Sequence, residues 1–257
     1  MGLHDGRVVV VTGAGSGIGR ATAERVVAEG GSVVAVDLHD DALSWIATHP
    51  VGSRFASLVG DVSTEATNTA AVALALTTFG RLDASVLNAG IAMSGDLLTM
   101  PMDEVDRVLA INVKSVVLGL RAAVPAMAAG GSFAVTASTS GLAGDPNMWP
   151  YNTSKGAVVN LVRAAALDLG PRGIRINAVC PGPTETGMTY RIKGVPEIYE
   201  GLRRRTALQR WGRAEEIAAV LSFLVSNDAS FVTGAAVPVD GGITASTGQF
   251  LPSERTY

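Results

Sequence analysis

Residues 8–19 read VVVVTGAGSGIG, and a helix-forming run follows them. The valines of Val8–Val11 predict a short strand. Glycines in Thr12–Gly19 permit a tight turn that brings backbone N–H groups close to an anion, and the N-terminus of the next helix adds partial positive charge. Strand, glycine-rich loop and helix in this order predict a dinucleotide pyrophosphate site, with an ordinary glycine turn as the alternative. The residues expected to form the site are Gly13, Ser16, Gly17, Ile18 and Gly19.

Short apolar runs alternate with helix-forming segments along the 257-residue chain. This alternation predicts βαβ units and a parallel sheet. We expect an α/β fold of the doubly wound (Rossmann) type, a three-layer sandwich around a seven-stranded parallel sheet. No repeat or linker is visible, so one domain is predicted over 1–257, with a core of 1–245 and a polar tail of 246–257. The predicted strands are Arg7–Val11, Ser32–Val36, Phe55–Val59, Leu82–Leu87, Ser132–Ala137, Ile174–Val179 and Ala236–Val239. The predicted helices are Ile18–Glu29, Asp41–Ala47, Thr64–Phe79, Met102–Met127 (interrupted or finished near Pro125), Pro150–Leu169 and Ala214–Leu224, with Glu185–Gln209 irregular or helical.

The composition excludes several classes of protein. Hydrophobic residues make up 47% of the chain and charged residues 17%, which excludes a disordered protein. Lys and Arg number 20 against 23 Asp and Glu, so there is no basic field to hold a nucleic acid. The longest uncharged stretch, Ala122–Gly144, contains Pro125 and is too interrupted for a membrane span. A single cysteine, Cys180, and three scattered histidines predict a cytoplasmic protein with no metal site.

Asp37 ends the second predicted strand, about 20 residues after the glycine-rich loop. A carboxylate there can accept hydrogen bonds from both hydroxyls of an adenosine ribose, and it repels a 2′-phosphate. Leu38 and Ser16 offer no cation for such a phosphate, and Arg20 is expected to face solvent or a neighbouring carboxylate. The sequence therefore favours NAD over NADP. The alternative is that Asp37 caps the next helix.

Tyr151 and Lys155 stand four residues apart near the start of a predicted helix. This spacing places them on one face, about 6 Å apart along the axis. A nearby ammonium stabilises a phenolate and lowers its pKa from about 10, so the pair suits general acid/base work on an alcohol or ketone. Ser138 ends the fifth strand at the sheet edge where ligands bind, and its hydroxyl could hold a substrate oxygen. Most such Tyr–Lys pairs lie on the solvent-exposed faces of helices and have no catalytic role. For Asn112, in the preceding predicted helix, the alternative is a polar side chain bonded to a helical carbonyl.

Together these residues resemble the classical short-chain dehydrogenases/reductases, in order and spacing, from about Arg7 to Ile243. The loop Thr12–Gly19 resembles the TGxxxGxG motif of that family. The matching catalytic tetrad is Asn112, Ser138, Tyr151 and Lys155. Other segments that match are Asp61-Val62, Asn88-Ala89-Gly90, Pro181-Gly182 with Thr186, Arg213–Ile217, Thr233-Gly234 and Val239–Gly242.

The resemblance implies a role for each group. Tyr151 would exchange a proton with the substrate oxygen, and Lys155 would lower the tyrosine pKa and bind the nicotinamide ribose. Ser138 would orient the substrate, and Asn112 would hold a water between Lys155 and solvent. The implied cofactor contacts are Asp61 and Val62 at adenine, Asn88, Ala89 and Gly90 beside the cofactor, and Pro181, Gly182, Thr184 and Thr186 at the nicotinamide.

Three positions depart from common family residues. Thr184 stands where Ile or Val is usual, which would alter the nicotinamide-side pocket; Leu87 and Ala137 also differ, and neither touches the tetrad. The expected activity is NAD(H)-dependent hydride transfer between a secondary alcohol and a ketone, with Tyr151 as general acid/base, in a homotetramer. The alternatives are a 3-oxoacyl thioester reductase, which usually takes NADPH, and a non-catalytic dinucleotide sensor. Asp37 argues against the first and the complete tetrad against the second.

Overall fold

A computed structural model describes residues 2–252 and places a seven-stranded parallel sheet at the centre of the molecule. The strand order is β3-β2-β1-β4-β5-β6-β9, so the chain winds outward from β1 in one direction and from β4 in the other. The predicted doubly wound α/β fold is therefore confirmed. The strands are β1 (Val8–Thr12), β2 (Ser32–Asp37), β3 (Phe55–Val59), β4 (Ala84–Leu87), β5 (Ser132–Thr136), β6 (Arg175–Pro181) and β9 (Ala236–Val239).

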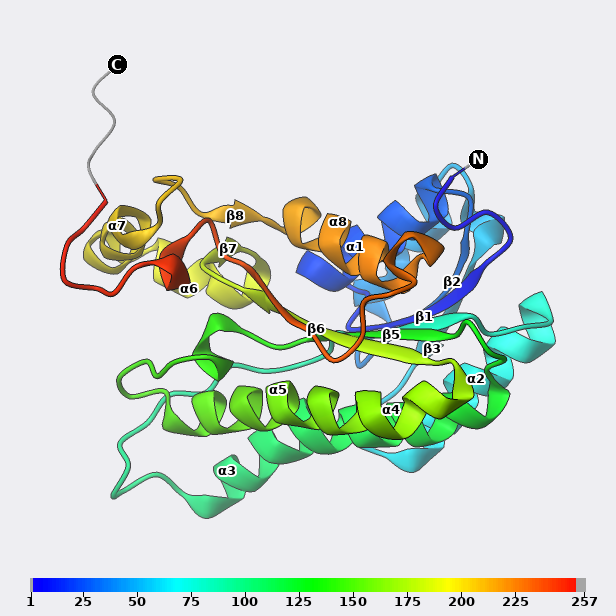
Figure 1. The fold of residues 1–257 in the computed structure, drawn as a ribbon, viewed down its shortest axis with the longest axis horizontal. Coiled ribbons are helices and arrows are strands. Elements are labelled where there is room, and N and C mark those ends of the chain that lie inside the picture. Colours follow the sequence, from blue (N-terminus) through cyan, green and yellow to red (C-terminus); the bar gives the residue numbers. More distant parts are fainter. Residues whose placement is uncertain (1, 253–257) are drawn as a thin grey trace.

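Helices cover both faces of this sheet and complete the three layers (Figure 1). Two helices pack side by side on one face, and four lie on the other. Two further helices lie beyond the sheet, near the end of the described chain (left in Figure 1). The first layer holds α1 (Gly17–Ala28) and α8 (Ala214–Val225); the second holds α2 (Glu65–Phe79), α3 (Met102–Leu109), α4 (Ser115–Ala123) and α5 (Trp149–Leu169); the helices beyond the sheet are α6 (Tyr190–Lys193) and α7 (Pro196–Arg205).

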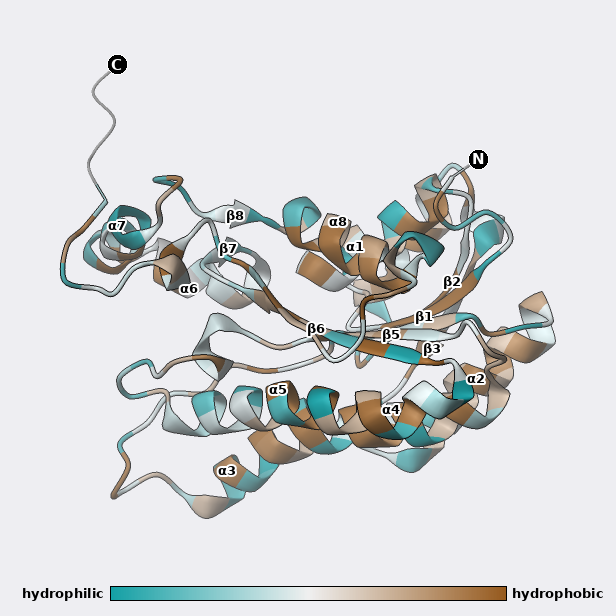
Figure 2. Cartoon of the chain, viewed as in Figure 1, coloured by the Kyte–Doolittle hydropathy of each residue, from teal (hydrophilic) through white to brown (hydrophobic). Residues whose placement is uncertain are grey.

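The valines of β1 show how the core is divided. Val8 and Val10 pack toward the layer of α2, α4 and α5, whereas Val9 and Val11 pack toward α1 and α8. Successive side chains of a strand point to opposite faces, and here both faces are covered. A strand in this position therefore requires an uninterrupted apolar run. In Figure 2 the brown, hydrophobic colour accordingly gathers on the central strands and on the helix faces that pack against them.

The predicted helix Met102–Met127 is interrupted in the structure. After α3 a π-helical turn spans Ala110–Lys114, and α4 follows it. A π turn inserts a residue into the helical repeat and redirects the side chains within it, one of which is Asn112. By length and composition alone, Met102–Ala126 is the one helical run among the described residues that could cross a bilayer; here it packs against α2 and β4.

Two other segments differ from the prediction. The short helix expected at 41–47 is a 3-10 helix over Asp41–Thr48, which still packs its Leu43 into the core. A second sheet, not predicted, pairs β7 (Thr184–Glu185) with β8 (Gly212–Arg213) in parallel. Of the expected tail 246–257, residues up to 252 are irregular, and 253–257 lie outside the described residues.

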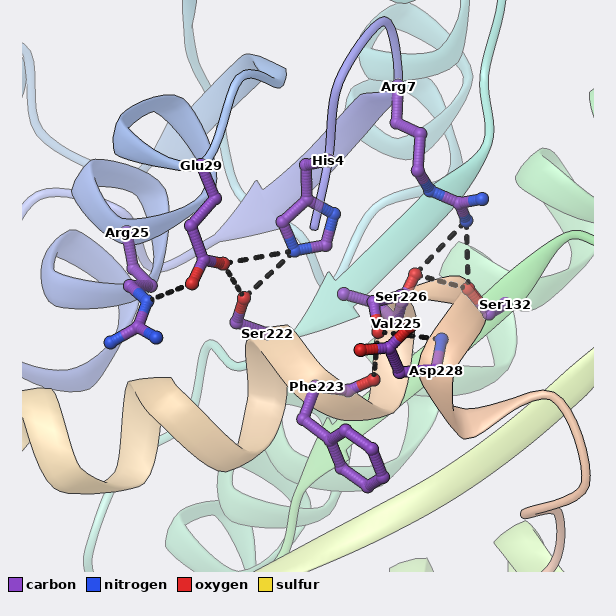
Figure 3. Close-up of polar contacts among 10 residues, drawn as sticks. All are labelled: His4, Arg7, Arg25, Glu29, Ser132, Ser222, Phe223, Val225, Ser226 and Asp228. Atoms are coloured by element: carbon purple, nitrogen blue, oxygen red, sulfur yellow. Dashed lines mark hydrogen bonds and ion pairs between the residues drawn. The ribbon is translucent and has the colours of Figure 1, made fainter. Parts of the chain in front are cut away.

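A buried polar cluster ties the N-terminal turn to two helices (Figure 3). His4 Nε2 lies 2.8 Å from the Ser222 hydroxyl of α8, and that hydroxyl donates to Glu29 Oε2 at 2.6 Å. Because Ser222 donates to Glu29, it accepts from His4, which puts the imidazole proton on Nε2. His4 Nδ1 is buried without a hydrogen-bond partner among the described residues. The pKa of His4 is lowered from 6.5 to about 4, chiefly by burial.

Candidate active site

Ser138, Tyr151 and Lys155 meet at the carboxyl edge of the sheet. Ser138 follows the end of β5 and caps the 3-10 turn Thr139–Gly141, where its hydroxyl accepts from Ser140 N at 3.1 Å. Tyr151 and Lys155 stand in the first turns of α5, and the side chain of Ser138 acts to lower the pKa of Tyr151. The prediction that these two side chains lie on one face of the helix is confirmed, since Lys155 Nζ lies 5.7 Å from the centre of the Tyr151 ring.

Asn112 joins this group from the π turn. Its Oδ1 accepts from Ile91 N at 2.8 Å, and its Nδ2 donates to Ile91 O at 2.9 Å and to the Ser154 hydroxyl at 3.0 Å. The alternative for Asn112, a bond to a helical carbonyl, is wrong, because both backbone contacts are to Ile91 in the loop after β4. Gly90 lies between two members of the tetrad: a Cβ there would be 3.1 Å from Asn112 Oδ1 and 3.4 Å from Lys155 Nζ.

The Lys155 ammonium is 4% exposed and donates to the carbonyl of Thr136 at 2.8 Å. Burial lowers its pKa from 10.5 to about 8, because the charged form loses its hydration. A lysine with such a pKa is more readily deprotonated near neutral pH than a solvated one. This carbonyl contact also fixes the direction of the side chain along the sheet edge.

The pKa of Tyr151 is raised in this structure, contrary to the expected lowering. Burial of the phenol is the largest cause, since it disfavours the phenolate. The side chain of Ser138 acts in the opposite direction and lowers the pKa, and the negative charge of Asp145 raises it further. In the protein alone, Lys155 therefore does not outweigh the loss of hydration. A cationic nicotinamide beside the ring would favour the phenolate.

The glycine-rich loop has the shape of an anion cradle. Gly13 has a φ of +66°, and a Cβ on Gly19 would overlap the Gly13 carbonyl oxygen. Ser16 is the N-cap of α1 but makes no side-chain capping bond. No side chain among residues 2–252 accepts a hydrogen bond from the N–H of Gly17 or Ile18. Open backbone donors at a helix N-terminus fit a pyrophosphate.

Asp37 lies beside this loop. Its Oδ2 accepts from Gly15 N at 2.8 Å, which holds the carboxylate at the end of β2. The helix-capping alternative is wrong, because the N-cap of the following 3-10 helix is Asp40. Arg20 pairs with Glu24 at 3.0 Å, as expected for a side chain that faces a neighbouring carboxylate.

Asp61 and Val62 follow β3 next to Asp37. A hydrogen bond joins the ends of β3 and β2, because Gly60 N donates to the Asp37 carbonyl at 2.8 Å. Asp61 Oδ1 accepts from Ser63 N at 2.8 Å, and Val62 is 8% exposed. The predicted adenine-side pair thus adjoins the predicted ribose-binding carboxylate.

Asn88 links three strand ends at the middle of the edge. Its Nδ2 donates to the Thr12 carbonyl at 3.1 Å, and its Oδ1 accepts from the Thr136 hydroxyl at 3.0 Å. Ala89 N donates to the Thr12 hydroxyl at 3.1 Å. The segment therefore holds the glycine-rich loop and the Lys155 anchor at fixed positions, which fits its predicted place beside the cofactor.

Thr186 and Thr184 follow Pro181 and Gly182 at the end of β6. A Cβ on Gly17 would lie 3.3 Å from the Thr186 Cβ, so Thr186 faces the glycine-rich loop, and its contact with the nicotinamide stays a prediction. Thr184 is 4% exposed, and its hydroxyl donates to the Gly182 carbonyl at 2.9 Å. The side chain of Thr184 is thus engaged within its own turn, and its contact with the nicotinamide stays a prediction.

Sequence reasoning missed two polar links. Ser154, three residues after Tyr151 on the same helix, accepts from Asn112 and donates to the Tyr151 carbonyl at 2.7 Å. Ser140 donates to Asp145 Oδ2 at 2.5 Å and thereby brings a carboxylate to the mouth of the site. The spacing of Ser154 on α5 could have signalled the first link. The second depends on a loop conformation that no periodicity encodes.

Comparison with known proteins assigns the chain to a family. The family model described as "Enoyl-(Acyl carrier protein) reductase" matches residues 13–244. Meso-2,3-butanediol dehydrogenase of Serratia marcescens is 42% identical over 247 residues, covering 95% of this chain and 97% of the relative. The crystal structure of levodione reductase superposes with a TM-score of 0.89 at 37% identity, covering 95% and 99% of the two chains. A 2-(R)-hydroxypropyl-CoM dehydrogenase of Xanthobacter autotrophicus is 39% identical, over 93% and 99%.

The chain belongs to the classical short-chain dehydrogenase/reductase family. It is an oxidoreductase that interconverts an alcohol and a carbonyl compound with a nicotinamide dinucleotide. The residues fit that cofactor, since the loop excludes side chains where a pyrophosphate would lie and leaves its amides open.

Proposed function

We propose that this protein is an NAD(H)-dependent dehydrogenase of a secondary alcohol. The preference for NAD rests on Asp37, whose carboxylate is fixed at the glycine-rich loop where an adenosine ribose would lie. A 2′-phosphate there would meet a negative charge. Arg20, the near cation in sequence, is engaged by Glu24.

One observation carries the chemical part of the proposal: Asn112, Ser138, Tyr151 and Lys155 converge at the edge where the sheet opens. In alcohol oxidation, Tyr151 takes the hydroxyl proton while Ser138 holds the same oxygen by a hydrogen bond. Bound NAD⁺ supplies the acceptor for the hydride that leaves the carbinol carbon. Lys155 keeps positive charge near the phenolate, and the Asn112–Ser154 contact fixes the helix turn that carries it.

The cofactor would be held by three groups of this chain. The loop amides from Gly13 to Gly19 would bind its pyrophosphate, Asp37 its adenosine ribose, and Asp61-Val62 its adenine. Asn88–Gly90 and the segment from Pro181 to Thr186 would border the nicotinamide. The relatives named as dehydrogenases of butanediol and hydroxypropyl-CoM, and as a levodione reductase, support an alcohol or ketone substrate.

We further propose a cytoplasmic homotetramer. Large apolar side chains that are exposed on this single chain, Leu167 of α5 and Phe223 of α8 with nearby Phe231, support burial against other copies. The buried free thiol of Cys180 agrees with a reducing compartment. Sedimentation of the purified protein tests the assembly: a monomer at micromolar concentration would contradict it.

The activity is tested with purified protein, NAD⁺ or NADP⁺, and a panel of acyclic, cyclic and sugar alcohols, with reduced cofactor followed by absorbance. We expect turnover of a secondary alcohol, with kcat/KM for NAD⁺ at least about tenfold above that for NADP⁺, the effect of one hydrogen bond to a charged group. NADPH-dependent reduction of a 3-oxoacyl thioester in place of alcohol oxidation would favour the runner-up, to which the description of the family model points. NADH binding with no turnover of any substrate would indicate a sensor.

A further inference from the structure

Asp145 is a carboxylate held at the mouth of the active site by bonds from two sides. Its Oδ2 accepts from the Ser140 hydroxyl at 2.5 Å, within the turn that Ser138 caps. Its backbone carbonyl accepts from Asn152 Nδ2 at 2.9 Å, in the first turn of the helix that carries Tyr151. The elements that carry both substrate-facing hydroxyls therefore fix the position of this loop residue.

Ser140 connects the carboxylate to the reacting centre. Its N–H donates to Ser138 Oγ at 3.1 Å, while its own hydroxyl donates to Asp145. Ser140 is only 9% exposed, so the connection runs through the protein and not through solvent. The charge of Asp145 also acts on Tyr151, whose pKa it raises. The carboxylate of Asp145 is thus separated from the substrate-facing hydroxyl of Ser138 by one residue and two hydrogen bonds.

The second carboxylate oxygen of Asp145, Oδ1, is available to accept a hydrogen bond from a ligand. Among the described residues, Oδ1 accepts no hydrogen bond, and Asp145 forms no ion pair with any cation. The residue itself is exposed. An ionised carboxylate only accepts hydrogen bonds, so it favours a ligand with an O–H donor and disfavours one with a negative charge.

We propose that Asp145 determines specificity by accepting a hydrogen bond from a second hydroxyl of the substrate. The substrate class is then a neutral diol or polyol, and the product is the corresponding hydroxy ketone. This inference rests on the proposed function, because it places the second hydroxyl relative to a carbinol oxygen held by Ser138 and Tyr151. The carbinol proton goes to Tyr151 and the hydride to NAD⁺, and the second hydroxyl is unchanged. Asp145 would repel acidic substrates.

The test compares matched pairs of alcohols that differ by one hydroxyl: propane-1,2-diol with propan-2-ol, and cyclohexane-1,2-diol with cyclohexanol. The measured quantity is the ratio of kcat/KM for the diol to that for the monohydric alcohol, with NAD⁺. Wild-type protein is expected to favour the diols by about tenfold or more. In Asp145→Ala this ratio falls by roughly 10-fold to 100-fold, the effect of losing a hydrogen bond to a charged group.

Two further variants control for indirect effects. Asp145→Asn keeps an acceptor oxygen without the charge and is expected to give an intermediate ratio. Asp168→Ala removes an exposed carboxylate near the far end of α5 and leaves the ratio at its wild-type value. NADH affinity is measured in every variant, and we expect it to stay unchanged in Asp145→Ala.

An unchanged ratio in Asp145→Ala, or an equal fall on diol and monohydric alcohol, would overturn the proposal while leaving the dehydrogenase activity intact. Wild-type protein could instead prefer 1-aminopropan-2-ol over both propane-1,2-diol and propan-2-ol. If that preference disappears in Asp145→Ala, the proposal is overturned in favour of a cationic substrate. If wild-type protein oxidises neither class of alcohol, the proposed function itself fails, and this inference with it.

Discussion

The buried imidazole of His4 is expected to make the free energy of unfolding depend on pH. His4 has no exposed surface, and its proton on Nε2 is committed to Ser222, so protonation would place a second N–H at Nδ1, where no acceptor lies among the described residues. Burial lowers the pKa, the charge of Glu29 partly offsets this, and the result is about 4 instead of 6.5. The folded protein therefore binds fewer protons than the unfolded chain between these two values, and stability falls as the pH falls through that window.

The magnitude follows from the two pKa values. Each unit of pKa difference corresponds to about 1.4 kcal/mol. At pH 5 the unfolded histidine is largely protonated and the folded one is not, so His4 destabilises the fold by about 2 kcal/mol relative to pH 7. Below about pH 4 both states are protonated, and the contribution of His4 no longer changes with pH.

Urea unfolding followed by tryptophan fluorescence measures this effect, with cofactor-free protein at one fixed concentration, at pH 7, 6 and 5. His4→Gln keeps a donor for Ser222 and does not titrate; its free energy of unfolding is expected to fall by about 2 kcal/mol less than that of wild type between pH 7 and pH 5. The matched control His39→Gln removes an exposed histidine and is expected to follow wild type. Parallel pH dependence of wild type and His4→Gln would refute the reasoning.

Two substitutions test the cofactor site. Asp37→Ala removes the carboxylate bonded to Gly15 and is expected to lower the NAD⁺ over NADP⁺ preference in kcat/KM by about tenfold or more; an unchanged ratio would show that selectivity lies elsewhere. Gly19→Ala places a Cβ against the Gly13 carbonyl, so NADH affinity measured by fluorescence titration is expected to weaken at least about tenfold, whereas Gly170→Ala, where a Cβ meets nothing within 4 Å, should bind NADH as wild type does.

The sequence predicted the fold and the Tyr–Lys pair because both are encoded locally, whereas Asn112 entered the predicted tetrad only through the family resemblance. A valine run, a glycine-rich loop and the Tyr–Lys spacing each depend on a few neighbouring residues, and parallel strands bring their ends to one edge. The π turn at Ala110–Lys114 could not be predicted, since its apolar pattern is that of an ordinary helix. The raised pKa of Tyr151 and the Ser140–Asp145 contact likewise depend on burial and on loop conformation, which exist only in the folded chain.

The most direct test of the catalytic account is Tyr151→Phe, which removes the phenol oxygen and keeps the ring. Two quantities are measured on the same preparation: NADH affinity by fluorescence titration, and turnover of a secondary alcohol with NAD⁺. The account predicts NADH affinity within about threefold of wild type, and kcat/KM lower by roughly 10²-fold to 10⁴-fold, the usual contribution of a general acid/base. Turnover at the wild-type rate would contradict the assignment of Tyr151 as the proton-transferring residue.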